Sequence, residues 1–264
     1  MSELISRHLH VEKEEAEKLI YYGSVWNNQT NRRLKNPFFN ITSETIVVNR
    51  PDFPITAYPF QKEDIIYEDP FFFAVYKKPF FPTVPTPYSD INSLVYGMNQ
   101  YLRSAGRNTE ALVINRLDLS TRGLVLLAKD KKIEGSLHTL FKNRMIRKYY
   151  LVKTERFDNV QRRYVMEDTL EWNGKIRQAK TLAFLLKTTD RYCCFLAVPR
   201  TGRTHQIRKH FAQYIHPIYG EPVYGNYSRE DDLGLICFCY IFRHPVTGHK
   251  VVIRYLPSDF MVMG

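Results

Sequence analysis

Apolar and polar positions follow a helical spacing near the start of the chain. Residues 12–22 carry one apolar face and are otherwise mostly polar, and Gly23 follows them as a residue suited to a helix C-terminus. The apolar face consists of Ala16, Leu19 and Ile20. A short amphipathic helix is therefore predicted. Val25-Trp26, a polar turn and an apolar-rich stretch at 41–48 then predict a hairpin that ends in a strand.

The rest of the chain alternates between apolar runs and amphipathic segments. The apolar runs predict strands at 71–76, 111–114, 124–128, 182–186, 192–198, 235–242 and 251–255. Helical spacing predicts helices over 91–102 with Asp90 as N-cap, over 133–141 with Asp130 as N-cap, and from an N-cap at Thr204 through Tyr214. Asn173-Gly174 predicts a hairpin turn. The sum is an α+β fold with a mixed, largely antiparallel sheet and flanking helices, preceded by a small α/β segment.

Prolines separate the small segment from the rest. Pro51, Pro54 and Pro59 follow one another closely, and such spacing favours extended chain because proline interrupts both helices and strand ladders. We therefore predict a small domain at residues 1–50, a Pro-rich linker at 51–62 and a main domain at 63–264.

The charge of the chain indicates the class of partner. The 264 residues include 38 Lys and Arg against 27 Asp and Glu, which gives a formal net charge of +11 and a sequence pI of about 9.4. This balance favours nucleic acid as partner, although a basic surface without such a role stays open. Aromatic residues make up 14% of the chain and offer rings on which bases can stack, although most are expected in the core.

The spacing of the cysteines and the length of the apolar runs indicate the cellular compartment of the protein. Cys193-Cys194 and Cys237-x-Cys239 lie inside apolar runs and match neither a zinc knuckle nor a redox pair, so we expect buried thiols in a reducing compartment. No segment approaches about 20 apolar residues, and the N-terminus has no long apolar core. These features predict a cytoplasmic protein that does not enter a membrane.

One carboxylate stands at the edge of the predicted sheet. Arg116-Leu117-Asp118 follows the strand at 111–114, and turn-forming residues separate it from the strand at 124–128. A carboxylate in this place loses hydration and needs a cationic or hydrogen-bonding partner. Taken by itself, Asp118 fits a turn or cap residue as well as a catalytic one.

Three stretches share the motifs of an enzyme family in the same order. Residues 116–123 fit the pattern R-L-D-x-x-T-x-G, residues 148–150 fit K-x-Y, and residues 201–208 read Thr-Gly-Arg-Thr-His-Gln-Ile-Arg. Together they resemble the RluA-type RNA pseudouridine synthases, over most of the chain. The resemblance implies the pseudouridine synthase catalytic fold and isomerisation of uridine in ribosomal or transfer RNA. It also implies an enzyme without metal or small-molecule cofactor, and we expect a monomer.

The resemblance assigns the chemistry to three residues. Asp118 is implied as the essential carboxylate, either as a nucleophile or as a stabiliser of positive charge. Arg208 is implied as its guanidinium partner. Tyr150 is implied as the ring beneath the uracil, with a hydroxyl that could also move a proton at carbon 5. The alternatives are a surface arginine on a helix and a tyrosine inside a strand.

Further residues are expected at the RNA. Arg116 would fill the space that an extruded base leaves, and Ile207 would form an apolar wall of the pocket. Lys148, Arg203 and His205 are expected to bind RNA or to support the site rather than to carry chemistry. The chain also departs from the family pattern at three positions: Asn115 replaces His, Arg122 replaces Ser, and Phe81 replaces the Gly of a K-P-x-G element. We expect Arg122 to add positive charge near the site.

Other interpretations stay open at this point. Residues 1–50 resemble a degenerate copy of the small RNA-binding domain that many bacterial pseudouridine synthases carry, and an ordinary helix and hairpin that cap the main domain is the alternative. A non-catalytic RNA-binding or ribosome-assembly protein would share the charge, the rings and the fold. A hydrolase or metal-dependent nuclease would use the histidines, for which the sequence offers no matching nucleophile or ligand set.

Overall fold

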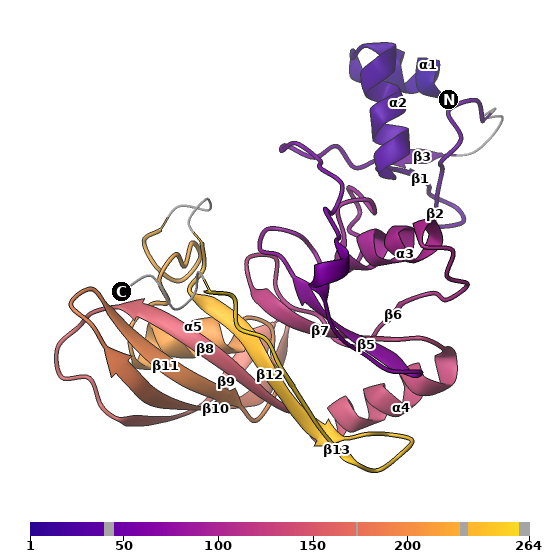
Figure 1. The fold of residues 1–264 in the computed structure, drawn as a ribbon. Helices are drawn as coiled ribbons and strands as arrows, with labels where there is room; N and C mark the ends of the chain where they lie inside the picture. The colour runs from indigo at the N-terminus through magenta and orange to yellow at the C-terminus, as the bar shows by residue number, and fades with distance from the viewer. Residues whose placement is uncertain (40–44, 173, 228–231, 259–264) are drawn as a thin grey trace. The chain divides into compact units, whose positions relative to one another are not determined.

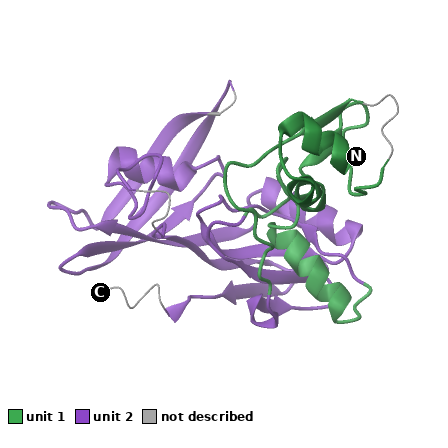
Figure 2. Ribbon diagram, turned by 90° about the horizontal axis from the view of Figure 1, so that it is seen from above, with its two compact units in different colours: residues 1–60, 82–108 green, residues 61–81, 109–264 purple. Residues whose placement is uncertain are grey.

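The computed structural model of the chain describes residues 1–39, 45–172, 174–227 and 232–258. The chain divides into two compact units (Figure 2). Unit 1 comprises residues 1–60 and 82–108, and unit 2 comprises residues 61–81 and 109–264. Within the described ranges, no helix has the length and apolar character that a membrane crossing requires.

Unit 1 begins as a small α/β body. Its elements are α1 (Ser2–Leu9), α2 (Lys13–Tyr22), α3 (Leu94–Ser104) and a sheet of order β2-β1-β3, with β1 at Val25–Asn27, β2 at Arg32–Arg33 and β3 at Ile46–Val48. The predicted apolar face of α2 is buried together with Ile5 and Val25. Gly23 ends α2 with φ +84°, a conformation that glycine adopts without steric cost. The prediction of this helix is therefore confirmed.

Unit 2 is built on a ten-stranded sheet (Figure 1). The main path of the sheet is β4-β5-β7-β12-β8-β11-β10-β9, with β13 paired to β12 and β6 paired to β7. The strands are β4 (Ile65–Glu68), β5 (Phe72–Lys77), β6 (Leu112–Val113), β7 (Arg122–Ala128), β8 (Arg147–Glu155), β9 (Arg163–Trp172), β10 (Lys175–Thr188), β11 (Tyr192–Pro199), β12 (Leu235–Arg243) and β13 (Lys250–Arg254). The helices are η1 (Lys62–Asp64), α4 (Lys131–Lys142) and α5 (Gln206–Tyr214). The predicted α+β class with a largely antiparallel sheet is confirmed.

Strands β7 and β12 pair in parallel. This pairing explains why the R-L-D-x-x-T-x-G stretch has glycine at position 123. Gly123 lies opposite Cys237 in this pair. A Cβ atom on Gly123 would stand 2.2 Å from the Cys237 carbonyl oxygen, and φ of Gly123 is +121°, which side chains rarely adopt. Only glycine therefore lets β7 approach β12 just after the chain has passed Asp118.

Of the two aspartates predicted as helix N-caps, one is confirmed and one is wrong. Asp130 accepts a hydrogen bond from a backbone N–H of the first turn of α4 at 2.9 Å, so its prediction as N-cap is confirmed. The prediction for Asp90 is wrong, because the Ser93 side chain caps α3. Asp90 instead pairs with Lys35 at 2.7 Å, a contact between distant positions that a local pattern does not reveal.

Most long apolar runs form strands as predicted. The hairpin β9–β10 places Trp172 opposite Lys175, as the Asn-Gly signal predicted, while Asn173 itself and residues 41–44 of the predicted N-terminal strand lie outside the described residues. The elements α1, β4 and β8 were not predicted. Cys193, Cys237 and Cys239 are buried free thiols, so their predicted burial is confirmed, while the reducing compartment stays a prediction.

The domain boundaries stay a prediction. The compact units group residues 82–108 with the N-terminal part of the chain. A division into an RNA-binding-like domain at 1–50, a linker at 51–62 and a catalytic domain at 63–264 is a statement about function, which compactness does not address.

Candidate active site

Asp118 lies in the turn between β6 and β7. The Thr121 N–H donates a hydrogen bond to the Asp118 carbonyl oxygen at 3.1 Å, which closes the turn. The Asp118 side chain keeps 30% of its surface exposed. The backbone of the turn is therefore fixed, while the Asp118 carboxylate stays partly accessible.

Two side chains at the start of α5 face the Asp118 carboxylate. Arg208 Nη1 and His205 Nε2 each lie 3.9 Å from Asp118 Oδ2. His205 stands at the N-cap position with left-handed φ of +54°, so the prediction of Thr204 as N-cap is wrong. Burial lowers the pKa of His205, while the charge of Asp118 acts to raise it. The imidazole is therefore mainly neutral at neutral pH, and Arg208 is the permanent positive charge of this group.

Glu221 is the close partner of Arg208. The guanidinium donates from Nε to Glu221 Oε2 at 2.7 Å and from Nη2 to Oε1 at 2.6 Å, and the two side chains are 4% and 0% exposed. Burial acts to raise the pKa of Glu221, but the hydrogen bonds and charge of Arg208 lower it below its usual value. This bidentate pair fixes the guanidinium plane and leaves Nη1 as the atom that faces Asp118.

Tyr224 completes this group of side chains. Its hydroxyl lies 2.9 Å from His205 Nδ1, and the Arg208 guanidinium carbon lies 5.5 Å from the centre of its ring. Glu221 Oε1 also accepts the Tyr224 N–H at 3.3 Å, so the same carboxylate shapes the loop that carries Tyr224. Sequence reasoning missed both Glu221 and Tyr224. One signal could have indicated Glu221, because a buried arginine needs an acidic partner.

Tyr150 lies inside the sheet on β8. It stands opposite Cys237 of β12 and Ala197 of β11, with 9% of its surface exposed. Burial, the Cys237 thiol to which its hydroxyl is hydrogen-bonded, and the charge of Asp118 together raise the pKa of Tyr150 well above its usual value of 10. The hydroxyl therefore stays protonated at neutral pH. Tyr150 is suited to stack and to donate a hydrogen bond rather than to act as a base.

A buried polar network fixes residues 201–208 against β10. Gln206 Oε1 accepts a hydrogen bond from the Thr201 hydroxyl at 2.6 Å. Gln206 Nε2 donates to the Lys180 carbonyl and to the Thr181 hydroxyl, both at 2.9 Å. Gln206 thus holds the motif loop to a neighbouring strand, a role that was not assigned from the sequence.

The other predicted site residues differ in how far their side chains are exposed. Ile207 is 7% exposed in the first turn of α5. Lys148 is half-buried on β8, and a Cβ atom on Gly202 would stand 3.3 Å from its Nζ. Arg203 donates from Nε to a backbone carbonyl of β10 at 3.1 Å, and Arg116 is exposed. The roles of these residues stay predictions.

Two departures from the family pattern have structural explanations. Asn115 donates to the Tyr240 hydroxyl at 3.0 Å and accepts a backbone N–H of β7 at 2.9 Å, so it fixes the segment before Asp118. Arg122 is a buried side chain whose Nη1 lies 3.9 Å from Asp232 Oδ2. Its charge thus faces the partly exposed carboxylate of Asp232, and the expectation that Arg122 adds positive charge near the site stays a prediction.

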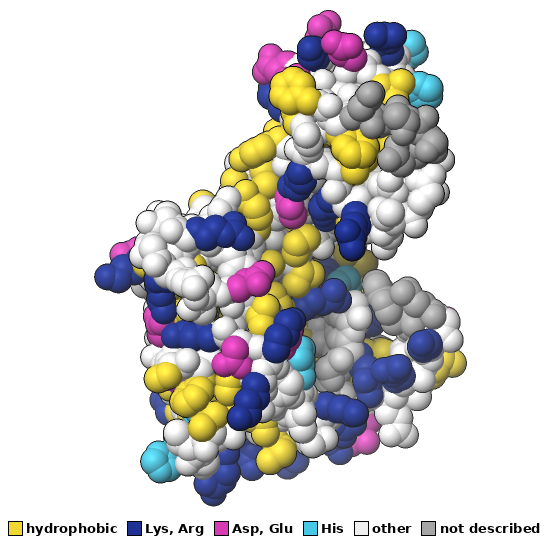
Figure 3. All heavy atoms as spheres, turned by 90° about the vertical axis from the view of Figure 1, so that its right-hand side faces the viewer, with side chains coloured by type: hydrophobic (Ala, Val, Ile, Leu, Met, Phe, Trp, Pro, Cys, Tyr) yellow, Lys and Arg dark blue, Asp and Glu magenta, His cyan; other side chains and the backbone are white. Residues whose placement is uncertain are grey.

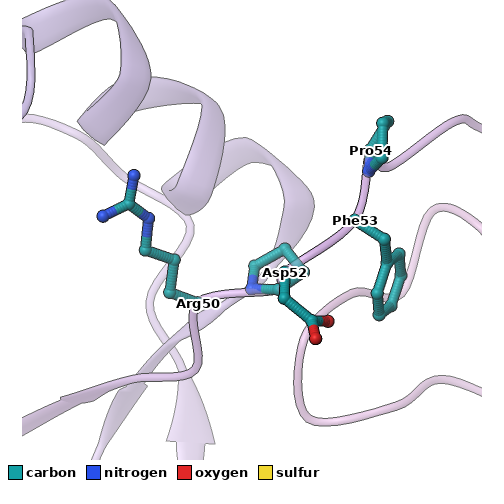
Figure 4. Close-up of a pocket in the computed structure, with 5 residues that line it drawn as sticks. Arg50, Asp52, Phe53 and Pro54 are labelled. Carbon is teal, nitrogen blue, oxygen red and sulfur yellow. The ribbon is translucent and has the colours of Figure 1, made fainter.

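A separate hollow lies in unit 1 (Figure 4). It measures about 520 Å³ and is lined by five consecutive residues, Arg50, Pro51, Asp52, Phe53 and Pro54. The Arg50 guanidinium and the Asp52 carboxylate point in different directions in Figure 4, and Arg50 pairs with Glu15 at 2.8 Å. None of the predicted site residues lines this hollow.

Comparison with known proteins identifies the family. A family model described as RNA pseudouridylate synthase matches residues 72–213. The dual-specificity RNA pseudouridine synthase RluA of Vibrio cholerae is 28% identical over 214 residues, which cover 75% of this chain and 83% of that protein. The tRNA pseudouridine synthase C of Pasteurella multocida is 24% identical over 220 residues, which cover 72% of this chain and 89% of that protein.

A solved structure supports the fold. Human RNA pseudouridylate synthase domain containing 4 aligns with a TM-score of 0.60 and 19% identity, over 75% of this chain and 90% of that chain. The family match spans more than half of the chain and includes Asp118, Tyr150 and Arg208. The chain therefore belongs to the RNA pseudouridylate synthase family, in its RluA-type branch, and is by that membership an RNA pseudouridine synthase, an isomerase.

Proposed function

We propose that unit 2 converts specific uridines of ribosomal or transfer RNA to pseudouridine, with Asp118 as the essential residue. The observation that carries this proposal is the partly exposed Asp118 carboxylate, 3.9 Å from an Arg208 guanidinium that Glu221 holds in place. The two classes of RNA follow the relatives, since one is named as a tRNA pseudouridine synthase and another, from Rickettsia bellii, as a ribosomal large subunit pseudouridine synthase.

The reaction requires a negative charge beside the glycosidic bond. The bond from ribose C1′ to uracil N1 breaks, the detached uracil turns, and a bond from C1′ to C5 forms. The proton on C5 leaves, N1 ends with a proton, and no electrons are exchanged. Positive charge develops on the sugar as the first bond breaks, and the Asp118 carboxylate stabilises that charge. Arg208 places a permanent positive charge 3.9 Å from that carboxylate.

The remaining site residues bind the uridine. A base inside structured RNA must be extruded at a cost of a few kcal/mol, and stacking on an aromatic ring returns about 1 to 3 kcal/mol. The Tyr150 ring takes this role, and Ile207 forms the apolar wall beside it. Arg116, exposed in the segment before Asp118, fills the space that the base leaves.

Release of tritium from RNA labelled at carbon 5 of uridine tests the proposed activity. The exchange of the C5 hydrogen makes the reaction visible, whereas product and substrate are isomers of equal mass. We expect release from bulk transfer or ribosomal RNA, and the two assayed in parallel define the substrate class. No release from either RNA, with RNA binding intact, would favour the non-catalytic RNA-binding alternative.

A nuclease or hydrolase that uses the histidines is less well supported. His205 and His210 are engaged by the hydroxyls of Tyr224 and Thr181, both at 2.9 Å. Within the described ranges, no three His, Cys, Asp or Glu side chains gather as a metal ion would need. Tritium release that persists in the presence of a chelator would favour the isomerase over a metal-dependent nuclease.

Arg203, in the motif stretch 201–208, has two further arginines near it. Partial burial and the positive charges of Arg177 and Arg144 lower the pKa of Arg203, so each of these two groups lies close enough to Arg203 to repel it. Figure 3 shows several Lys and Arg side chains on the lower part of the face that it presents. Guanidinium groups that repel one another at a surface bind phosphates, whose negative charge offsets the repulsion. We infer that Arg144, Arg177 and Arg203 contact phosphates near the target uridine.

Salt dependence checks these phosphate contacts. Arg177→Gln is expected to weaken RNA binding and to reduce the slope of log Kd against log salt by about 1, measured by fluorescence anisotropy at about 50 to 200 mM salt. Arg191→Gln is the matched control, because Arg191 is exposed beyond the opposite end of β10. An equal change of slope in both variants would assign the effect to net charge rather than to the three arginines.

A further inference from the structure

Lys77 is a buried lysine next to the proposed catalytic residue. It ends β5 with 0% exposure, and its Nζ donates to the carbonyl oxygens of Lys78, Phe81 and Leu119 at 2.9, 2.7 and 3.0 Å. An ammonium group has three N–H donors, whereas a neutral amine has two. The three carbonyls therefore match the charged form of Lys77.

These carbonyls belong to two different turns. Phe81 lies in the turn after β5, where the left-handed residue is Phe80, with φ +61°, and not position 81 where the family has Gly. Leu119 follows Asp118 directly in the turn that leads to β7. Strand β5, which precedes the first turn, pairs with β7, which follows the second turn. In this pairing Lys77 lies opposite Gly123. The ammonium group thus ties the turn that carries Asp118 to the turn after β5 from inside.

Opposing effects set the charge of Lys77. Burial lowers its pKa to about 7, and the negative charge of Asp118 acts to raise it. The neighbouring segments also carry Lys78 in the turn, Arg122 at the start of β7 and Cys237 on β12. Burial raises the pKa of Cys237 to about 11, so this thiol stays neutral at neutral pH. Asp118 is thus the negative charge among these groups.

We propose that Lys77 is a positioning residue for the reaction: its ammonium group holds the Leu119 carbonyl, and thereby the Asp118 carboxylate, and its charge stabilises that carboxylate. The inference rests on the proposed function of Asp118. It also explains why a lysine is kept in the interior, where a charge persists only with hydrogen bonds or a partner. The charge is present below the pKa of Lys77 and is lost as pH rises through it. The rate of the enzyme therefore falls on the alkaline side of that pKa.

The test is the pH dependence of kcat for tritium release by the full chain, with the wild type and two variants. Lys77→Met keeps the length of the side chain and removes its charge and donors. We expect kcat to fall by about 100-fold with KM within about twofold of the wild type, because a displaced carboxylate slows the chemical step. We also expect the alkaline fall of the wild type to be absent.

Lys153→Met is the matched control. Lys153 is likewise buried, at 2% exposure, on β8 of the same sheet. Its Nζ lies over the rings of Tyr192 and Tyr219, at 4.8 and 5.4 Å from their centres, instead of against the Asp118 turn. This variant loses a buried lysine and is expected to keep the wild-type pH profile and kcat.

Two results would overturn the inference. One is a Lys77→Met enzyme with wild-type kcat or with the alkaline fall intact. The other is a wild-type rate that stays level between about pH 6 and pH 9, which decides the matter even where Lys77→Met does not fold. Absence of tritium release from the wild type at every pH would instead refute the proposed function, so the two failures are distinguishable.

Discussion

Asp118→Asn is expected to lower tritium release from RNA by about 10⁴-fold or more while RNA affinity stays at the wild-type value. The amide has nearly the shape of the carboxylate and lacks its charge, so it stabilises neither a developing cation nor a covalent intermediate. Arg208 Nη1 and His205 Nε2 each lie 3.9 Å from the carboxylate. The fold therefore does not depend on a short hydrogen bond to Asp118. Single-turnover tritium release and a binding titration measure the two quantities.

Asp190→Asn is the control for this change. Asp190 carries the same side chain in a fully exposed position, 3.7 Å from Arg156. It should release tritium at the wild-type rate. An Asp118→Asn enzyme that kept more than about a tenth of the wild-type rate would remove Asp118 from the chemistry and shift attention to binding alone.

Glu221→Gln is expected to lower the free energy of unfolding by about 3 to 5 kcal/mol. The substitution keeps the shape of the side chain but leaves the Arg208 charge buried without its partner, since the two side chains are 0% and 4% exposed. Urea denaturation at neutral pH measures the loss. The rate of tritium release should also fall, because the guanidinium that faces Asp118 is no longer held in its plane.

A second variant separates the ion pair from general damage. Glu221→Gln combined with Arg208→Met should recover part of the stability, because the unpaired charge is gone, while activity stays low. Glu68→Gln breaks the more exposed pair with Lys129, whose atoms lie 2.6 Å apart, and should cost less than about 1 kcal/mol. Equal losses in Glu68→Gln and Glu221→Gln would contradict the importance of burial.

The same pair predicts a pH dependence of stability. The pKa of Glu221 is lowered in the folded protein from its unfolded value of 4.5. A group with a lowered pKa contributes its full stability above the unfolded value and loses it as pH falls through the folded value. Wild-type stability should therefore decrease below about pH 4.5, and Glu221→Gln should lack that part of the decrease.

Local patterns predicted the fold where the signal lies within the segment itself. The signals for the β9–β10 hairpin and for the Asp130 cap are each contained in a few consecutive residues, and the hairpin pairing and the cap are both confirmed. The cap at Asp90 failed because a competing contact with Lys35 arises only after folding. β8 was missed because its charged ends and tyrosines obscure the apolar run in its middle.

The site was predicted only as far as the motifs reach. Asp118, Arg208 and Tyr150 stand in recognisable stretches, and the structure brings the first two to 3.9 Å. Glu221, Lys77 and Cys237 were missed because each becomes part of the site through strand pairing or loop closure. Such contacts depend on three-dimensional register, which the residues on either side of a position do not encode.

The pairing of β7 with β12 has a consequence for the synthesis of the protein. The Tyr240 hydroxyl donates to the Leu124 carbonyl across 116 positions of the chain, and Asn115 reaches Tyr240 across 125. The ribosome therefore delivers the loop of Asp118 long before the strand that supports it. A nascent chain can carry every recognisable motif and still have no assembled site until β12 has emerged. A chain cut short before residue 235 would for the same reason keep its signature and lose its activity.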